Sequence, residues 1–360
     1  MSVYIGTMIL VMLLGYMAET NREVVFNTLD KKVYIKNGKK YNFFVLWTAM
    51  CLILVAGLRW QVGTDYNSYA RGYENTLLTV WESIKTLDEP GYKVLAWLSS
   101  FVYHDYASMF FVLAIFTVGL NVKTISKYSN DFLFGILLYM FIGAWHGSFN
   151  AVRQYAAAAI LFCGHRYIYE RKFWKYMLVV FGAFLFHRTA LIMIPVYFLG
   201  RTKVNIKVTA VIVGTMLFFS YSLDYMFQIM SYYKGTDQTE YAYMTTEVNA
   251  LRILVAFAPL LIIAILPKGF RKNTENAFYI NMLIINATLM FATSSSAYLA
   301  RVGIYTDIYA TIAIPRLKNG FTEQSRKIFT AIVLLFYCMF WLYEIYARNN
   351  LSDFNWIFNR

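Results

Sequence analysis

The chain has 360 residues, of which 59% are hydrophobic, 19% aromatic and only 15% charged, with a formal net charge of +13. Soluble domains usually contain about 25% charged and about 45–50% apolar residues, so the composition excludes a soluble enzyme, a disordered chain and a secreted disulfide scaffold. The three cysteines lie far apart within apolar runs, without the spacing of a disulfide framework or a metal site. The sequence therefore predicts an integral membrane protein.

Apolar runs of roughly 17–25 residues are typical of membrane-spanning helices. They predict an all-α polytopic membrane protein, a single transmembrane domain over residues 1–360 with about twelve helices, some of them short. These helices are expected near 3–18, 43–58, 107–122, 132–146, 151–168, 173–187, 189–200, 207–223, 250–267, 277–293, 298–315 and 328–346. Between them, the outer side is expected to carry a long loop at 59–106, with an amphipathic interfacial helix near 90–103, and a second loop at 224–249.

Lysine and arginine predict which side each loop faces, because cytoplasmic loops hold the excess of both. One set of alternating loops contains 22 of the 33 basic residues, which places it in the cytoplasm and both termini outside. The net charge is then a signal of topology, and no nucleic-acid partner is expected. Basic clusters flank 173–200 on both sides, so this segment is predicted to be a helical hairpin with its tip at His187-Arg188. Whether 188–200 spans the membrane or re-enters it stays open.

Arginine dominates the basic residues of the outer side, where eight Arg accompany three Lys. A guanidinium binds phosphate through planar, bidentate contacts. Its burial at a helix centre costs about 2.5–3.5 kcal/mol, which a charge-assisted hydrogen bond of roughly 1.5–3 kcal/mol offsets. A single such Arg is usually a snorkelling anchor, but several at one face favour an anionic substrate. The candidate diphosphate-binding residues are Arg59, Arg153, Gln154, Arg188, Arg252 and Arg301.

Four groups of polar and aromatic residues follow one another along the predicted outer side. They are Arg59 to Tyr69, Trp145 to Gln154, Phe186 to Thr189 and Tyr298 to Tyr305. In the first group, Asp65 either caps the following helix or acts as a catalytic carboxylate. In the third, His187 is a candidate base because imidazole titrates near neutral pH. Asp307 lies deeper in its predicted span. It is either a functional acid or the buried partner of an arginine.

The sequence contains no His, Asp or Glu cluster with the spacing of metal ligands, and no Walker or Rossmann glycine pattern. We therefore expect neither a metal nor a cofactor.

The polar groups resemble the ordered motifs of the EpsG family, whose members are polytopic proteins related to the Wzy-type polysaccharide polymerases of bacterial envelopes. The matching residues run in family order from 59 to 315. They are Arg59 with Gly63-Thr64-Asp65-Tyr66 and Tyr69, Glu89-Pro90-Gly91-Tyr92, Asn150 with Arg153-Gln154, Phe186-His187-Arg188-Thr189-Ala190-Leu191, and Arg301 with Tyr305 and Pro315. Arg188 and Thr306 differ from the residue types common at their positions.

The resemblance implies a metal-independent glycosyltransferase of the bacterial inner membrane, with its active site facing the periplasm and a fold similar to the membrane-embedded (GT-C-like) enzymes. It would join undecaprenyl-diphosphate-linked oligosaccharide repeat units by block transfer into a surface polysaccharide. Its partners would be those lipid-linked donors and acceptors, membrane lipids and a chain-length regulator protein. Two alternatives stay open from the residues: a lipid-linked glycan flippase, and an O-antigen ligase-type transferase.

Within this hypothesis, Arg153 neutralises the departing diphosphate together with Arg59 or Arg301. Asp65 or His187 takes the proton of the acceptor hydroxyl, with Asp65 narrowly favoured. Catalysis would thus rest on Asp65, His187 and Arg153. Because tyrosine and tryptophan rings pack well on sugar faces, the candidate glycan-binding residues are Tyr66, Tyr69, Trp145 and Tyr305.

Overall fold

A computed structural model describes residues 1–27, 32–37, 42–202, 246–347 and 353–360, together with Ala210, Gly214, Phe218 and Ser222. The helix predicted at 207–223 and the outer loop predicted at 224–249 lie almost wholly outside the described residues. Within the described ranges, regular structure is helical apart from two antiparallel sheets of two strands each. The all-α character predicted from the sequence is therefore confirmed.

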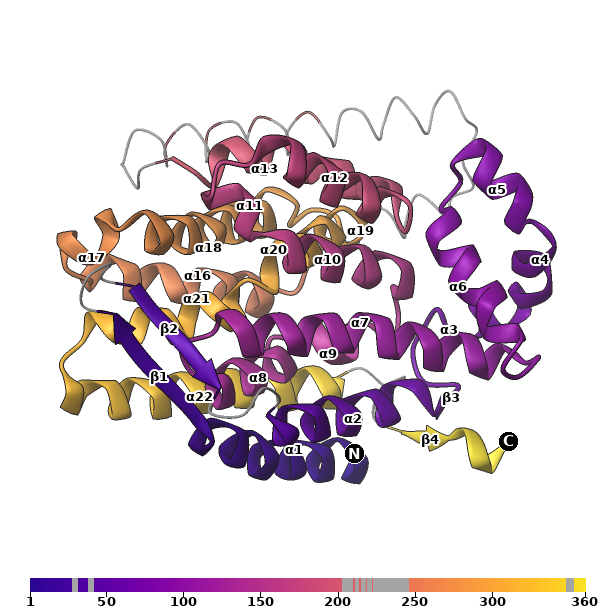
Figure 1. Cartoon of the computed structure of the whole chain (residues 1–360), viewed down its shortest axis with the longest axis horizontal. Coiled ribbons are helices and arrows are strands. Elements are labelled where there is room, and N and C mark those ends of the chain that lie inside the picture. Colours follow the sequence, from indigo (N-terminus) through magenta and orange to yellow (C-terminus); the bar gives the residue numbers. More distant parts are fainter. Residues whose placement is uncertain are drawn as a thin grey trace.

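Three helices in the described ranges are long and apolar enough to cross a membrane: α1 (Ser2–Thr20), α7 (Tyr106–Tyr128) and α22 (Glu323–Ala347). Shorter apolar helices accompany them: α2 (Phe43–Gly57), α8 (Phe132–Phe141), α12 (Phe173–Phe184), α13 (Met193–Leu199) and α16 (Ala250–Ile265). Two further helices, α10 (Val152–Gly164) and α18 (Thr274–Ala292), also belong to the bundle in Figure 1. These elements make the chain a membrane protein, while the total of about twelve crossings stays a prediction.

Basic segments predicted to share one side of the membrane meet at one end of the bundle. Here lie the hairpin of β1 (Arg22–Asn27) and β2 (Lys32–Asn37) and the short helix α17 (Lys268–Lys272), on the left in Figure 1. Arg22 donates to the carbonyls of Ser126 and Ser129, and Lys318 pairs with Asp131. The hairpin was not predicted from the sequence. Which compartment this end faces stays a prediction.

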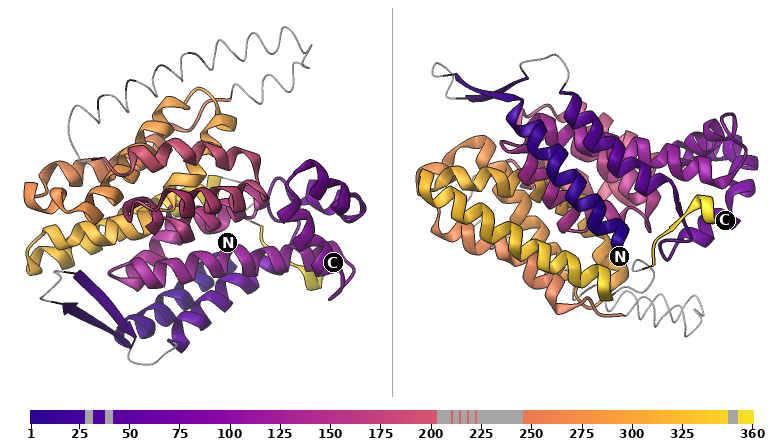
Figure 2. Two further views of the ribbon diagram at one scale, coloured as in Figure 1. Left: turned by 45° about the horizontal axis from the view of Figure 1, so that its top comes forward. Right: turned by 90° about the horizontal axis from the view of Figure 1, so that it is seen from below.

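Both chain termini lie at the opposite end, which we call the outer end. It also carries four short helices, α3 (Tyr66–Arg71), α4 (Tyr73–Leu78), α5 (Val80–Thr86) and α6 (Pro90–Ser100), on the right in Figure 1. Figure 2 shows them at the same end from two further directions. The ring of Tyr4 contacts those of Trp145 and Phe354, so the first and last turns of the chain touch. α6 coincides with the helix predicted near 90–103, whose interfacial position stays a prediction.

The segment from 173 to 200 is a helical hairpin, as predicted. After α12 the chain turns and continues through the 3-10 helix η1 (Arg188–Ile192) into α13, while the short α11 (Arg166–Tyr169) precedes the hairpin. Tyr176 of α12 stacks on Tyr197 of α13 and donates to the carbonyl of Met193. These contacts close the hairpin and place its tip at the outer end.

Among the segments predicted as continuous spans, those at 132–146 and 298–315 are interrupted. The first ends at α8 because Gly143 adopts a left-handed conformation (φ 90°), after which the single turn α9 (Ala144–Gly147) begins. The second is divided into α19 (Ala297–Ala300), the 3-10 helix η2 (Arg301–Gly303), α20 (Ile304–Asp307) and α21 (Ala310–Leu317). Hydropathy alone does not register such breaks, because a left-handed glycine or a short 3-10 turn leaves the run as a whole apolar.

The C-terminal residues close the outer end. Strand β4 (Asn355–Trp356) pairs with β3 (Arg59–Trp60), and the amide of Ile357 donates to the carbonyl of Leu58 at 2.8 Å. At the last residue, Arg360 pairs with Asp105 at 2.6 Å. Residues nearly 300 positions apart in the chain therefore hold one another in place.

Deletion of residues 353–360 is expected to lower the melting temperature of the purified protein by a few degrees. Each lost hydrogen bond contributes about 0.5–1.5 kcal/mol, and a loss of 1 kcal/mol shifts the melting temperature by roughly 2–4 °C in a large domain. Arg360→Ala alone is the control and should have little effect, because exposed ion pairs contribute about 0–1 kcal/mol. An unchanged melting temperature after the deletion would show that β4 does not stabilise the bundle.

Candidate active site

The carboxylate of Glu89 joins three segments that are far apart in the sequence. Its Oε2 accepts a hydrogen bond from Arg153 at 2.5 Å, and its Oε1 accepts one from Nδ1 of His187 at 2.6 Å. The backbone amide of Arg188 approaches the same Oε1 at 3.4 Å. With a side chain only 9% exposed, Glu89 needs these donors to remain ionised in a dry environment. We call Glu89, Arg153 and His187 the Glu89 cluster.

Local backbone geometry aims Glu89 at its partners. Glu89 precedes the first residue of α6 in a left-handed conformation (φ 51°), and Pro90 begins that helix. The amide of Gly91 then donates to the carbonyl of Leu185, next to the hairpin tip, at 2.8 Å. A Cβ atom at Gly91 would lie 2.7 Å from the ring of Phe186, so only glycine permits this approach. The start of α6 and the tip of the α12–α13 hairpin are thus in direct contact.

Arg153 lies in the first turn of α10 and faces both Glu89 and two aromatic rings. Its Nε donates to the hydroxyl of Tyr69 at 3.3 Å, and its guanidinium lies 5.6 Å from the ring centres of both Tyr69 and Tyr92. The side chain is nevertheless 41% exposed. Arg153 is therefore a fixed cation with part of its donor edge open to a ligand.

The electrostatics of the cluster determine the proton position on His187. Burial raises the pKa of Glu89, but the hydrogen bond from His187 and the charge of Arg153 outweigh it and hold that pKa below its usual range. An ionised carboxylate is only an acceptor, so Nδ1 of His187 carries the hydrogen in their contact. A neutral imidazole then has its lone pair on Nε2, which is the form of a general base oriented by a carboxylate.

All four sequence groups converge beside the cluster: Tyr69 of the first contacts Arg153, and hydrogen bonds link the other three. Gln154, next to Arg153, donates to the carbonyl of Arg301 at 2.8 Å. Thr189, two residues after His187, shares a hydrogen bond of 2.7 Å with the hydroxyl of Tyr305. α10, η1 and α20 thereby meet at one place. Tyr305 itself is fully buried, so its ring packs the interior and its hydroxyl joins two elements.

Asp65 belongs to a different part of the outer end. It lies at the N-terminus of α3 without a capping hydrogen bond from its side chain, which accepts one from Thr64 at 3.3 Å. Gly63 just before it has φ 108°, and its backbone approaches Asn150, whose side-chain oxygen accepts the amide of Thr64 at 2.7 Å. The capping role considered for Asp65 is therefore absent in this structure, and the residue is directed to a neighbouring pocket.

Arg59 is a structural residue in this fold. It is 3% exposed, and its guanidinium donates to the carbonyls of Ala56, Val62 and Phe149. The rings of Phe110 and Phe149 cover it, with centres 4.7 and 4.9 Å away. Enclosed in this way, Arg59 ties β3 to the loop before α10. The predicted contact between Arg59 and a diphosphate does not fit its burial.

Carboxylates of the chain itself neutralise several of the other arginines. Arg188 pairs with Asp88 at 2.7 Å, and Arg252 forms a bidentate pair with Glu344, with an Nε to Oε1 distance of 2.9 Å. Together with the pairing of Arg153, these contacts show that an excess of outer arginine does not by itself require an anionic substrate. A diphosphate would have to share these cations with their carboxylates.

Two further residues predicted to bind glycan are core residues. Tyr66 stacks on Phe110 at 4.5 Å and is 1% exposed, while Trp145 is fully buried and donates to the carbonyl of Leu52 at 3.2 Å. Tyr69 is half-buried beside Arg153. Of the four predicted residues it is the one that contacts a member of the Glu89 cluster, and its glycan-binding role stays a prediction.

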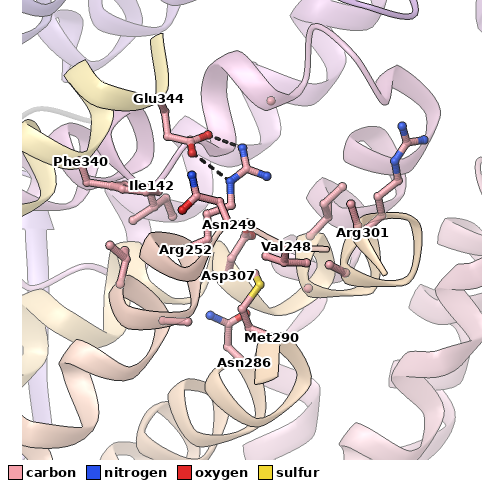
Figure 3. A pocket seen from close by; sticks show the side chains of 18 of the residues that line it. Ile142, Val248, Asn249, Arg252, Asn286, Met290, Arg301, Asp307, Phe340 and Glu344 are labelled. Carbon is pink, nitrogen blue, oxygen red and sulfur yellow. Dashed lines mark hydrogen bonds and ion pairs between the residues drawn. The ribbon is translucent and has the colours of Figure 1, made fainter. Parts of the chain in front are cut away.

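A pocket of about 910 Å³ opens beside α10 (Figure 3). Asp65 and Arg301 line its outer part, and Asp307 lines it more deeply. Figure 3 shows the paired side chains of Arg252 and Glu344 facing each other across one wall, while Arg301 extends from a separate element. In the described ranges, no group of three or more His, Cys, Asp or Glu residues is placed to hold a metal ion.

Glu89 is the principal residue that sequence reasoning did not assign to the site. Glu89 lies within the family motif Glu89-Pro90-Gly91-Tyr92, but the motif alone does not assign it a role. The sequence feature that could have indicated Glu89 is a carboxylate directly before Pro90, at the start of a helix in the predicted outer loop. Because its partners lie 64 and 98 residues away, no local pattern links the three.

Comparison with protein-family models finds a match to the EpsG family over residues 41–357, nearly the whole chain. No curated protein and no solved structure matches the chain, so the expected similarity to membrane-embedded glycosyltransferases stays a prediction. The family match contains every motif described above, including the residues of the Glu89 cluster. The chain therefore belongs to the EpsG family, a family of Wzy-type polysaccharide polymerases, and has a polymerase or glycosyltransferase-type role in general.

Proposed function

We propose that this protein joins polyprenyl-diphosphate-linked oligosaccharide repeat units into a surface polysaccharide at the outer face of the bacterial inner membrane. The growing glycan is passed as a block from its lipid diphosphate to a hydroxyl group on the next lipid-linked repeat unit. The observation that carries the proposal is the Glu89 cluster: a fixed, partly exposed guanidinium beside a carboxylate-oriented imidazole, at the predicted outer end of a membrane-helix bundle.

Each member of the cluster has a chemical task in this reaction. The acceptor oxygen forms a bond to the anomeric carbon of the growing chain while the bond from that carbon to the diphosphate breaks. His187 takes the hydroxyl proton through Nε2, a role that contributes roughly 10²–10⁴-fold in rate. Arg153 balances the charge that develops on the leaving diphosphate, and loss of one such partner costs about 10²–10³-fold. Glu89 is a positioning residue, because it orients both.

Deletion of the gene in a strain that produces the polymer tests the function directly. A polymerase mutant should still display glycan of a single repeat unit, because assembly and transport of that unit do not need the missing step. Gel analysis of the surface glycan and mass spectrometry of the lipid-linked precursors measure the outcome. Complete absence of surface glycan, with repeat units retained on the cytoplasmic side, would instead indicate a flippase and overturn the proposal.

Glu89→Gln is expected to reduce polymer yield at least tenfold at unchanged protein abundance. The amide keeps the shape of the side chain, but it removes the charge that Arg153 faces and the anionic acceptor that orients His187. Asp88→Asn is the matched control. Its carboxylate pairs with exposed Arg188, and both side chains are at least half exposed, so a small effect is expected. Equal yields from the two variants would contradict the central place of Glu89.

The identity of the base is tested by His187→Gln and Asp65→Asn. Gln cannot cycle a proton near neutral pH, so His187→Gln should abolish polymer while lipid-linked repeat units still bind. Asp65→Asn removes a carboxylate that makes no capping hydrogen bond in this structure. A loss of polymer in this variant would therefore not be explained by a lost helix cap. The geometry favours His187, which reverses the narrow preference for Asp65. If the Asp65→Asn protein is inactive and the His187→Gln protein is active, Asp65 is the base and the assignment to His187 is wrong.

A further inference from the structure

The pocket beside α10 is separate from the Glu89 cluster and has a different chemical character. It extends from Thr64, Asp65 and Asn150 at the outer end to Asp307 and Leu283 within the helix bundle. At about 910 Å³, it has the size range of sites for small organic ligands, which is roughly 300–1,000 Å³. None of the three members of the cluster lines it.

The charges that line this pocket are mostly negative. Four acidic residues and two arginines contribute to the wall: Asp65, Glu247, Asp307, Glu344, Arg252 and Arg301. Arg252 and Glu344 neutralise each other in a bidentate pair. Asp307, buried with no donor to its Oδ1, is not held ionised, which leaves the carboxylates of Asp65 and Glu247 and the guanidinium of Arg301. Because like charges repel strongly where water is scarce, this lining disfavours a diphosphate or a sugar that carries an acidic group.

One of the four acidic side chains lacks a hydrogen-bond donor. Oδ1 of Asp307 is buried and has no hydrogen-bond partner among the described residues. An unsatisfied buried acceptor costs about 1–3 kcal/mol, so a ligand that brings a donor recovers this energy. Hydroxyl and ammonium groups of sugars are such donors.

The remaining wall combines amides with aromatic and aliphatic side chains. Asn249 and Asn286 contribute amides, and Tyr337, Phe340 and Val255 contribute apolar surface. Asn286 already accepts a hydrogen bond from Thr306 at 2.8 Å, which fixes the orientation of its amide. Apolar surface with a few fixed polar groups is typical of a small-molecule site, and ring faces suit the apolar faces of sugars.

We propose that this pocket binds a sugar residue that bears no carboxylate or phosphate, either neutral or amino-substituted, from the lipid-linked repeat unit. This inference rests on the proposed polymerase function and extends it, because it assigns the glycan and the diphosphate to different places. Asp307 accepts a hydrogen bond from the sugar, and the diphosphate stays with the exposed edge of Arg153. The pocket thus selects repeat units by the absence of an acidic group at the bound sugar.

The test measures binding of two probes to purified protein in detergent. One probe is the repeat-unit oligosaccharide, released by mild acid from lipid-linked precursors of the gene-deletion strain. The other is undecaprenyl diphosphate without sugar. Asp307→Asn should weaken binding of the oligosaccharide at least tenfold and leave binding of undecaprenyl diphosphate within about twofold, while Arg153→Gln should do the reverse. The matched control Asp353→Asn alters an exposed carboxylate that is not among the pocket residues and should change neither.

Ala297→Trp keeps the inference testable if Asp307→Asn destabilises the fold. Ala297 is exposed at the pocket wall, so a large ring there narrows the pocket without entering the core, and it should also weaken oligosaccharide binding tenfold or more. Unchanged oligosaccharide binding in folded Asp307→Asn and Ala297→Trp proteins would overturn the inference. Loss of undecaprenyl diphosphate binding alone would overturn it too, by assigning the pocket to the lipid diphosphate. Pocket-dependent sugar binding by a protein whose deletion leaves polymer length unchanged would support the inference and refute the proposed function.

Discussion

A buried carboxylate must be surrounded by donors, because its desolvation costs several kcal/mol unless it is paired. Glu89 meets this constraint by bringing together α10 through Arg153 and the α12–α13 hairpin through His187. Removal of Arg153 would leave the carboxylate without a compensating charge, and removal of His187 would leave its Oε1 with only the amide of Arg188 at 3.4 Å. The requirement for pairing therefore fixes the relative positions of three elements, and the same requirement makes the guanidinium and the imidazole available, in defined orientations, for chemistry on a ligand.

Helix α10 stands between the two functional regions. Its adjacent residues Arg153 and Gln154 face different neighbours: Arg153 contacts Glu89, and Gln154 contacts the backbone of Arg301, which lines the pocket. The buried residues Ala156 to Ala159 allow the next turn of this helix to pack closely. A rigid wall shared by a charged cluster and a pocket suits a reaction in which a lipid diphosphate and a sugar must be held side by side.

Much of the bundle follows from hydropathy, because helices such as α1, α2, α7 and α16 are apolar runs with polar ends. The loop alternation, and the basic clusters around 173–200, also predicted the hairpin correctly. The breaks after Phe141 and around Arg301 could not be predicted in this way, since they depend on one left-handed glycine and a 3-10 turn. His187 and Arg153 were identifiable as polar residues at helix ends. The buried environments of Arg59 and Tyr66, and the link through Glu89, depend on tertiary contacts across many tens of residues.

The β3–β4 pairing imposes an order on biosynthesis. Strand β3 emerges from the ribosome with residues 59–60, but its partner at 355–356 is made almost 300 residues later. At about 5–20 residues per second, the ribosome needs roughly 15 to 60 s to synthesise the chain between them. During that interval Arg59 and the segment before α3 stay without their final strand partner. The outer end of the bundle is therefore completed only after residues 355–356 have emerged, and a nascent chain stalled before residue 353 would lack the contact that closes it.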